Sequence, residues 1–313
     1  MRAATFALAV ALDACTGDPP TALHPVALVG AAARRLHAQA PAGERARRGY
    51  GTAVAAALPL AAAATATGLV QLGRRVHPLV GAGAAVTLAS LTSALRTLCV
   101  RAQEVERALV RGELEAARSL AGRHLVSRDT AALDASEVAG ATIASVAENL
   151  SDGVVAPWLA YACGGTGAAW AYRAANTLDA LWGYRTREFE ALGWGAARLD
   201  DALNLVPARA TAAAIVGAAA LPGQRGHCDA RRALAVWRRD ASRTASPNAG
   251  QPMAAMAGAL GVRLAKRDAY TLGAELRAAA PADIGRAVAL ARSAAWLACG
   301  GVAGALLAAE LAR

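Results

Sequence analysis

The feature that most constrains this chain is residues 51–73, a long stretch without a single charged side chain. A transmembrane helix needs about 20 mostly apolar residues, so this stretch is long enough to cross a bilayer. Four further apolar stretches lie at residues 79–95, 154–172, 210–223 and 287–309, and only the last contains a charge, Arg292. We therefore predict an all-α, polytopic integral membrane protein with about five apolar segments, because lipid admits only backbone whose hydrogen bonds are satisfied internally.

The charged residues lie between the apolar stretches rather than in one tract. The chain has 33 basic and 23 acidic residues, and its 56% of hydrophobic residues excludes a disordered chain. Arginines concentrate at residues 34–48 and 96–128, which by the positive-inside rule face the cytoplasm. We predict a single membrane-embedded domain over residues 1–313 in the cell membrane, with polar helical cytoplasmic loop regions at 96–153 and 224–286. Such arginines suit an anionic lipid surface, and we expect no nucleic-acid partner.

Simple alternation of spans would place residues 173–209 outside the cell, away from the other polar regions. Residues 154–172, however, contain Pro157 and the Gly164–Gly165 pair, and residues 210–223 are short for a full crossing. We predict that both stretches are broken or re-entrant, a path that membranes tolerate where protein buries the backbone. All polar regions, and an active site built from them, would then face the cytoplasm.

Four polar clusters flank the apolar stretches. In the first, Glu148 and Asp152 are one helical turn apart with Asn149 beside them, a spacing that suits a hard cation such as Mg²⁺. In the second, Asn176 and Asp179 share one helix face. The others are Asp200 and Asp201 with Asn204, and a turn containing Ser246 and Asn248 that could present amides to an anion. Taken alone, each cluster also fits a solvated helix face, a helix cap or an ion pair.

Common catalytic signatures are absent from the sequence. There is no Walker A motif, no GxGxxG after a strand pattern and no GxSxG elbow. The carboxylates gather at the ends of apolar stretches and in loops rather than inside them, which favours an enzyme over a transport pathway. Together the clusters indicate a site at a membrane surface.

These clusters occur in an order that resembles a known family. The most specific matches are Ala-Glu-Asn at residues 147–149 and Asn-Thr-Leu-Asp at residues 176–179. Further matches are residues 12–13, 17–19, 24–26, 30, 102–106, 127–130, 151–153, 156–157, 171–175, 183–184, 197–201, 204, 207–209, 246–248 and 257–262. Over nearly its whole length the chain resembles the adenosylcobinamide-phosphate synthase family, the CobD/CbiB-type membrane proteins of cobalamin biosynthesis. It departs from the family pattern at Ser127, where glycine is frequent, and at residues 249–253 and 270–273.

The resemblance implies an amide ligation that depends on ATP. Adenosylcobyric acid supplies a carboxylate, an amino-alcohol phosphate such as aminopropanol phosphate supplies the amine, and the product is adenosylcobinamide phosphate. ATP is the co-substrate that activates the carboxylate, and Mg²⁺ and arginines neutralise its phosphates. Beyond these substrates and the lipid bilayer, a homo-oligomer or a contact with other cobalamin-assembly membrane proteins is expected. The alternative functions are a non-catalytic membrane regulator or a transporter that shares the fold.

Site roles follow from residue chemistry within these clusters. We predict Asp129 or Glu137 as the base that takes a proton from the ammonium group. The full set of predicted catalytic residues is Asp129, Glu137, Glu148, Asn176 and Asp179. The predicted metal ligands are Glu148, Asp152, Asp179, Asp200 and Asp201. The predicted substrate- and phosphate-binding residues are His24, Arg128, Thr130, Asn149, Arg173, Tyr184, Arg198, Asn204, Ser246 and Asn248.

Overall fold

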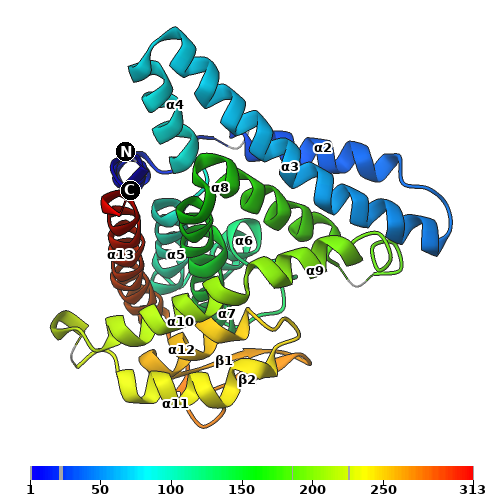
Figure 1. Cartoon of the computed structure of the whole chain (residues 1–313). Helices are drawn as coiled ribbons and strands as arrows, with labels where there is room; N and C mark the ends of the chain where they lie inside the picture. The colour runs from blue at the N-terminus through cyan, green and yellow to red at the C-terminus, as the bar shows by residue number, and fades with distance from the viewer. Residues whose placement is uncertain (1, 21–23, 185, 225, 313) are drawn as a thin grey trace. The chain divides into compact units, whose positions relative to one another are not determined.

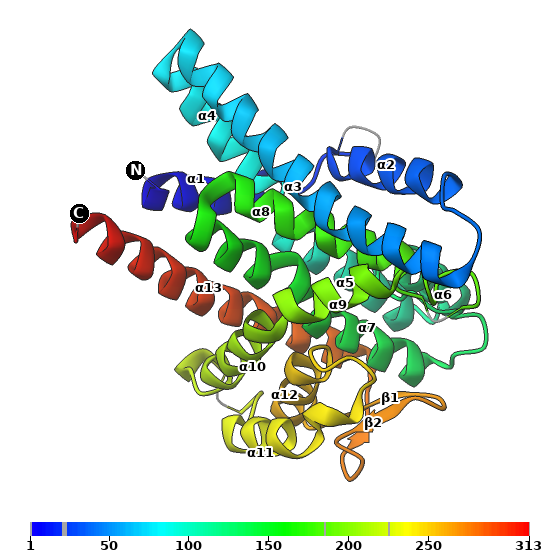
Figure 2. The same ribbon diagram turned by 45° about the vertical axis from the view of Figure 1, so that its right-hand side comes forward.

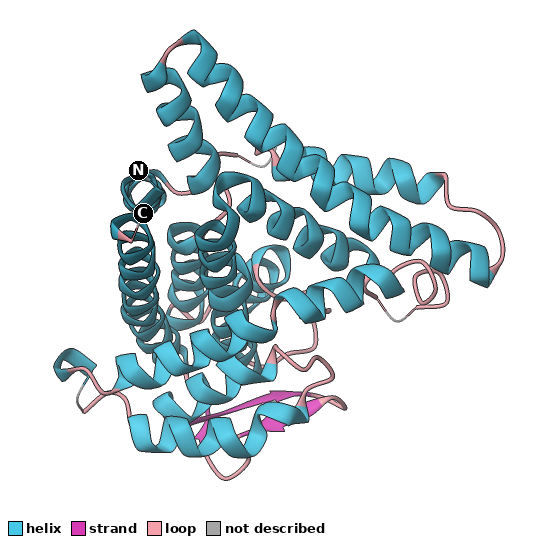
Figure 3. Ribbon diagram, viewed as in Figure 1, coloured by secondary structure: helices cyan, strands magenta, loops and turns pink. Residues whose placement is uncertain are grey.

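A computed structural model describes residues 2–20, 24–184, 186–224 and 226–312. Contacts between residues divide the chain into two compact units, each built from separate pieces of sequence. Unit 1 comprises Met1–Ala94, Ala156–Asn204 and Val302–Arg313, and unit 2 comprises Leu95–Val155 and Leu205–Gly301. Within the described residues the chain is mostly helical with one small sheet, as Figure 3 shows. The expected single membrane-embedded domain stays a prediction.

Unit 1 consists of helices in the described residues. They are α1 (Arg2–Thr16), α2 (Val26–Ala38), α3 (Glu44–Val76), α4 (Pro78–Ser90), α8 (Ala156–Trp182), α9 (Trp194–Leu203) and the last turns of α13 (Pro281–Leu311), as labelled in Figure 1. α3 packs along both α4 and α8. The pairing of α3 with α4 depends on glycine, because a Cβ on Gly73 would lie 3.1 Å from the Cα of Gly81.

The apolar core of unit 1 joins four helices and the segment before α9. Its buried residues are Ala33, Val54, Ala55, Leu178, Trp182, Leu192 and Ala196. The core therefore fixes the C-terminal half of α8 against the first turns of α3.

Helix α1 and the last turn of α13 also meet in this unit. The carboxylate of Glu310 accepts hydrogen bonds from the backbone N–H groups of Arg2 and Ala3.

Unit 2 surrounds a short buried helix, α12 (Gly250–Leu260), whose residues are almost all inaccessible to solvent. Around it lie α5 (Leu95–Val110), α6 (Leu114–His124), α7 (Ala135–Leu150), a π-helix at Ser151–Val155, α10 (Leu205–Ala219), α11 (Ala230–Asp240) and most of α13, with 3₁₀ turns at Pro222–Gln224 and Ala241–Arg243. α12 contacts α10, α11 and α7.

A three-stranded sheet completes unit 2 and was not expected from the sequence. Its strands are β1 (Val262–Lys266), β2 (Tyr270–Leu272) and β3 (Arg277–Ala278), in the order β2-β1-β3. β1 pairs with β2 antiparallel, with Lys266 opposite Tyr270, and pairs with β3 parallel. The alternation of buried Val262 and Leu264 with exposed neighbours is the period-two pattern of a strand, hidden here by its shortness.

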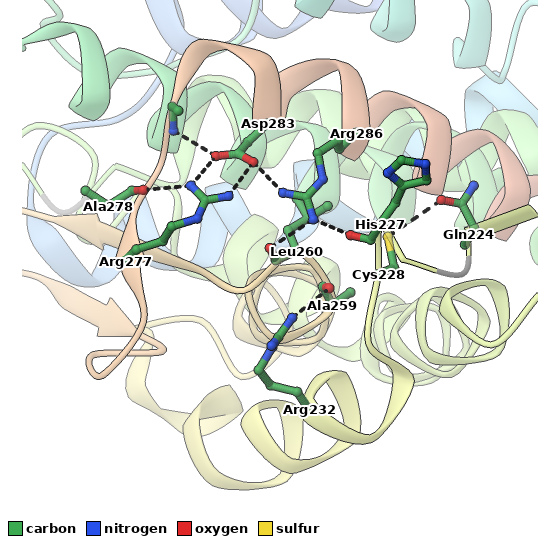
Figure 4. A network of polar contacts seen from close by, with 11 residues as sticks. Gln224, His227, Cys228, Arg232, Ala259, Leu260, Arg277, Ala278, Asp283 and Arg286 are labelled. Carbon is green, nitrogen blue, oxygen red and sulfur yellow. Dashed lines mark hydrogen bonds and ion pairs between the residues drawn. The ribbon is translucent and has the colours of Figure 1, made fainter.

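The buried carboxylate of Asp283 ties the strand end to α13. It accepts hydrogen bonds from Arg277 Nη1 and Nη2 at 2.6 and 2.7 Å and from Arg286 Nη1 at 2.6 Å. Arg286 in turn donates to the backbone oxygens of His227 and Leu260, so one network joins four segments of unit 2 (Figure 4). The two guanidinium groups that share the Asp283 carboxylate stabilise its buried charge.

Three described helical stretches are long and apolar enough to cross a membrane: Glu44–Val76, Pro78–Val110 and Pro281–Leu311. They cover the predicted segments 51–73, 79–95 and 287–309, so these are confirmed as candidate spans. The expected count of five is not confirmed. Residues 154–172 do not qualify, and residues 210–223 qualify only as part of α9 and α10, which together pass the test but are bent by 44° at the break between them.

The predicted break near Gly164–Gly165 is present in α8. Gly165 has φ +70° and ψ −157°, outside the helical region and open mainly to glycine. The two halves of α8 consequently run in different directions (Figure 2). Beyond the break, Gly167 packs closely on Ala63 and Thr67 of α3, and Leu178 and Trp182 share a core with Val54. The C-terminal half of α8 therefore runs antiparallel to α3; the re-entrant path stays a prediction.

Candidate functional site

A buried hydrogen-bond chain links α8 and α9 in unit 1. The hydroxyl of Tyr172 donates to Asn204 Oδ1 at 2.7 Å, and Asn204 Nδ2 donates to Asp200 Oδ2 at 2.9 Å. Asn176 Nδ2 donates to the other carboxylate oxygen of Asp200 at 3.2 Å. Asn204 is 1% exposed, so its amide orientation is fixed by these partners. The predicted residues Asn176, Asp200 and Asn204 thus come together as one cluster.

Asp179 joins the same cluster through its charge. Burial first, and then the neighbouring carboxylates of Asp200 and Asp201, together raise the pKa of Asp179 to about 7. Gly183 leaves room for this carboxylate, because a Cβ there would lie 2.2 Å from Asp179 Oδ1. Arg198 lies 3.6 Å from Asp201 on the exposed side. The cluster therefore presents oxygen acceptors and excess negative charge, which suits a cationic group better than a phosphate.

The local sequence explains how α8 and α9 meet. On α8, Tyr172, Asn176 and Asp179 follow at intervals of four and three residues and so share one face. On α9, Asp200 and Asn204 are four residues apart, with Asn204 as the helix C-cap. Two polar faces with this spacing can pair along their length when the helices pack together, as α8 and α9 do.

The segment between α8 and α9 is held against the arginine-rich start of α3. Arg47 Nη2 donates to the backbone oxygen of Glu188 at 3.0 Å, and His37 Nε2 lies 3.1 Å from the Glu188 carboxylate. The guanidinium of Arg48 stacks on the ring of Trp194 at 4.0 Å. Glu188 and Trp194 therefore lie beside the basic first turns of α3 and the end of α2.

Glu148 and Arg128 lie in unit 2, where their charges act on Tyr270. Burial, helped by the Glu148 charge and opposed by the Arg128 charge, raises the pKa of Tyr270 to about 12. The Tyr270 hydroxyl lies 3.7 Å from the sulfur of Met253 on α12. The sequence analysis predicted both Glu148 and Arg128 as site residues. The structure adds Tyr270, one of the residues 270–273 at which the chain departs from the family pattern.

Other predicted residues on or before α7 have local structural partners. Asn149 Nδ2 donates to Ser145 O at 3.0 Å, and the Thr130 hydroxyl donates to Arg118 O at 2.9 Å. Exposed Asp129 accepts from the backbone N–H of Ala131 at 2.9 Å, an Asx turn. These contacts fix the loop before α7.

Glu137 forms a capping box and an ion pair. Its side chain accepts from the backbone N–H of Asp134, whose carboxylate caps α7 in return. Arg267 donates to both Glu137 oxygens at 2.6 and 2.7 Å, and this arginine above all lowers the pKa of Glu137. A carboxylate with a lowered pKa is a weak proton acceptor, which argues against Glu137 as the base.

Ser246 and Asn248 form the turn that starts α12. The Ser246 hydroxyl accepts from the backbone N–H of Asn248 at 3.2 Å, and the buried Asn248 side chain lies 3.5 Å from Arg209 Nη1. Arg209 was quoted in the sequence pattern but not chosen as a site residue. Its position on α10, within the matched residues 207–209, was the signal in the sequence.

Four predicted residues remain. His24 lies 3.6 Å from Asp18 through Nε2 and accepts from the backbone N–H of Val26 through Nδ1, so it orders the start of α2. Arg173, half-buried on α8, has its Nε without a hydrogen-bond partner among the described residues. Tyr184 is 48% exposed after α8. Asp152 lies half-buried in the π-helix that follows α7, a local distortion that is common at functional sites.

The predicted metal ligands divide between the units, with Glu148 and Asp152 in unit 2 and Asp179, Asp200 and Asp201 in unit 1. Among the residues the structure describes, no group of three or more His, Cys, Asp or Glu side chains is arranged to hold a metal ion. Both oxygens of Asp200 accept amide N–H groups. The predicted metal ligands therefore stay a prediction.

Sequence reasoning also missed Tyr172 as a site residue. It lies on α8 four residues before Asn176 and seven before Asp179, so helical spacing placed it on the same face. A tyrosine in that position offers a hydroxyl donor to a buried amide, which is its role here.

Comparison with known proteins decides the family. The family model described as CobD/Cbib protein matches residues 6–291. The chain belongs to the CobD/CbiB family. Among curated relatives, a cobalamin biosynthesis protein CobD of Mycobacterium tuberculosis (strain CDC 1551 / Oshkosh) is 40% identical over 301 residues, covering 93% of this chain and 91% of that protein. No solved structure matches the chain.

Other CobD proteins are similar to a comparable degree. The cobalamin biosynthesis protein CobD of Pelobacter propionicus is 38% identical over 269 residues, or 85% of this chain and 80% of that protein. A probable cobalamin biosynthesis protein CobD of Methanothermobacter thermautotrophicus is 36% identical over 267 residues, or 85% of each chain. Membership of the CobD/CbiB family places this protein in cobalamin biosynthesis and agrees with its membrane-length helices.

Proposed function

We propose that this CobD/CbiB protein is an ATP-dependent ligase that joins adenosylcobyric acid to an amino-alcohol phosphate, such as aminopropanol phosphate, to give adenosylcobinamide phosphate. The family and the names of its relatives support a role in cobalamin biosynthesis. The single observation that favours ligation to an amine is the half-buried acceptor cluster around Asp179.

The chemical difficulty is that a carboxylate resists attack by an amine. Transfer of the ATP γ-phosphoryl group to a carboxylate oxygen gives an acyl phosphate and ADP. The amine nitrogen then attacks the acyl carbon, the C–N bond forms, and the C–O bond to phosphate breaks to release inorganic phosphate. Before that attack the ammonium must lose a proton, so the reaction needs a base beside the amine.

We assign that base to Asp179. Its pKa of about 7 means that it is largely ionised just above neutrality and can still hold a proton. Asn176, which gives its amide N–H to Asp200, keeps its carbonyl oxygen to accept an N–H of the ammonium. Glu137 has a lowered pKa and two donors from Arg267, so we assign it to the structure of α7 instead.

Phosphate recognition is assigned to arginines and amides away from the acidic cluster. The negative charge of the acidic cluster would repel a phosphate. We therefore place the phosphates of ATP or of the amino-alcohol on residues that carry hydrogen-bond donors: Arg128, Arg173, Arg209 and the turn at Ser246 and Asn248. Mg²⁺ would enter with ATP, since this ion is usually held by substrate phosphates and one or two carboxylates.

We further propose that the acidic cluster faces the cytoplasm, where ATP is available. Glu188 and Trp194 contact the basic start of α3, the end that the positive-inside rule assigns to the cytoplasm. A variant with its native cysteines replaced and Ala180→Cys added tests this in sealed vesicles of known orientation. Labelling of this exposed position only from the outer side would refute the proposal.

The decisive experiment incubates the purified full chain in lipid or detergent with adenosylcobyric acid, aminopropanol phosphate, ATP and Mg²⁺. Mass spectrometry should detect the condensed corrinoid, and ADP should form with it in equal amount. Asp179→Asn should abolish the product, whereas Asp268→Asn, at an exposed turn residue with φ +57° that asparagine tolerates, should not. Unchanged corrinoid with the folded wild-type protein would favour a regulator or transporter.

A further inference from the structure

Helix α9 carries an exposed stripe opposite its buried face. Gly195 and Ala196 are buried, whereas Trp194 is 40% exposed and the side chain of Arg198 is 59% exposed. Trp194 and Arg198 are four residues apart and so lie on one face of the helix. Water is a poor environment for a large indole, but an aromatic ring beside arginines is typical of the membrane–water interface.

The position of this stripe is set by α3. That helix starts with Glu44 and Arg45, continues through Arg47 and Arg48, and then carries no charge over residues 49–73. At 1.5 Å per residue the uncharged stretch is about 37 Å long, enough for the roughly 30 Å hydrocarbon core. The stack of Arg48 on Trp194 therefore lies where the span leaves the hydrocarbon core.

Close backbone contacts hold the start of α9 at this level. A Cβ on Gly51 would lie 1.9 Å from the backbone oxygen of Leu192, and one on Gly195 would lie 2.6 Å from the Cα of Thr52. These contacts leave no space for α9 to slide along α3. The first turn of α9 is thus fixed at the depth of the first apolar turn of the span.

We propose that α9 lies in the membrane interface and that Arg48, Trp194 and Arg198 form a binding surface for the headgroups of anionic phospholipids. Charge complementarity favours anionic headgroups as the ligand, because the exposed side of this surface carries arginines. Of the two acids of α9, Asp200 bonds to Asn176 and Asn204, and Asp201 pairs with Arg198. The same helix carries Asp200 on its inner side, so the acidic cluster is held at the membrane surface. The proposal does not depend on the ligase reaction.

The test uses the full chain in phosphatidylcholine vesicles that contain phosphatidylglycerol. Lipids carry bromine either near the headgroup or near the bilayer centre, and the fluorescence of Trp194 is the difference between wild type and Trp194→Phe. We expect that component to be quenched by the shallow bromines and little by the deep ones. If neither the shallow nor the deep bromines quench Trp194, and Trp194 is shielded only when the protein is a dimer, then a second copy covers α9 and the proposal is overturned.

Lipid preference provides the second measurement. Arg48→Gln and Arg198→Gln should each weaken the preference for phosphatidylglycerol over phosphatidylcholine by about fivefold, as expected for one arginine at an anionic surface. The matched control is Arg238→Gln, which removes the same charge from an exposed position on α11 and should leave the preference for phosphatidylglycerol unchanged. Wild-type preference in both Arg48→Gln and Arg198→Gln proteins would contradict the assignment of the headgroup surface.

Discussion

Replacing Asp179 with asparagine should stabilise the protein at high pH while it removes activity. The folded-state pKa of Asp179 is about 7, against 3.8 for an unperturbed aspartate. Between these values the folded protein binds the proton that the unfolded chain has lost, so stability falls as pH rises from about 4 to about 7. The asparagine variant has no such proton.

The size of the effect follows from the shift in pKa. Each pKa unit corresponds to about 1.4 kcal/mol, so a shift of about three units amounts to on the order of 4 kcal/mol above pH 7. The wild-type protein carries this penalty at pH 8 and does not carry it at pH 4. Asp179→Asn should therefore gain up to this amount relative to wild type at pH 8, and the gain should vanish at pH 4.

Thermal unfolding in detergent, followed by circular dichroism at several pH values, measures this difference. Asp268→Asn serves as the control, because Asp268 is exposed and its replacement should not change the pH profile. A difference between Asp179→Asn and wild type that is the same at pH 4 and pH 8 would refute the reasoning, since it would mean that Asp179 does not hold its proton in the folded protein.

Three further substitutions test the local structure. Tyr172→Phe should cost about 1–3 kcal/mol of stability and lower the ligation rate, because Asn204 Oδ1 loses its buried donor; thermal unfolding and product formation measure the two effects. Glu137→Gln should cost about 1 kcal/mol by weakening the capping box of α7, but product formation should persist. Gly195→Ala should destabilise unit 1 by about 1–3 kcal/mol in thermal unfolding, because its Cβ would lie 2.6 Å from the Cα of Thr52.

For each of these substitutions, one outcome would contradict the prediction. Gly49→Ala is the control for Gly195→Ala, because a Cβ at Gly49 has nothing within 4 Å, and equal stability of the two variants would count against the close contact. Loss of product with Glu137→Gln at wild-type stability would return Glu137 to the catalytic residues. A Tyr172→Phe protein as active and as stable as wild type would remove Tyr172 from the cluster.

The membrane-length helices could be predicted because their signal is local. The uncharged residues 49–73 leave no alternative to a long apolar helix, and the pair Gly164–Gly165 marks the break in α8. The short sheet was missed because three brief strands give few positions for a period-two pattern. Residues 210–223 were recognised as short for a full crossing, and the structure has them in the 15-residue helix α10.

Within the candidate site, spacing along one helix was informative and pairing between helices was not. Asn176 and Asp179 were placed on one face by their separation, yet only packing shows that Asn176 donates to Asp200 twenty-four residues away. Glu137 illustrates the opposite error. Asp134 stands three residues before it at the start of α7, which is the spacing of a capping box, and this local signal was available in the sequence.

The meeting of the chain ends at Glu310 has a practical consequence. Since the backbone N–H groups at the start of α1 bond to a carboxylate in the last turn of α13, a short peptide could join the two ends without moving either helix. New ends opened at the exposed turn at Gly112, where φ is already +77°, would give a circular permutant with a tag far from that carboxylate in sequence. A tag fused directly to α1 or α13, by contrast, competes with the hydrogen bonds that fasten one to the other.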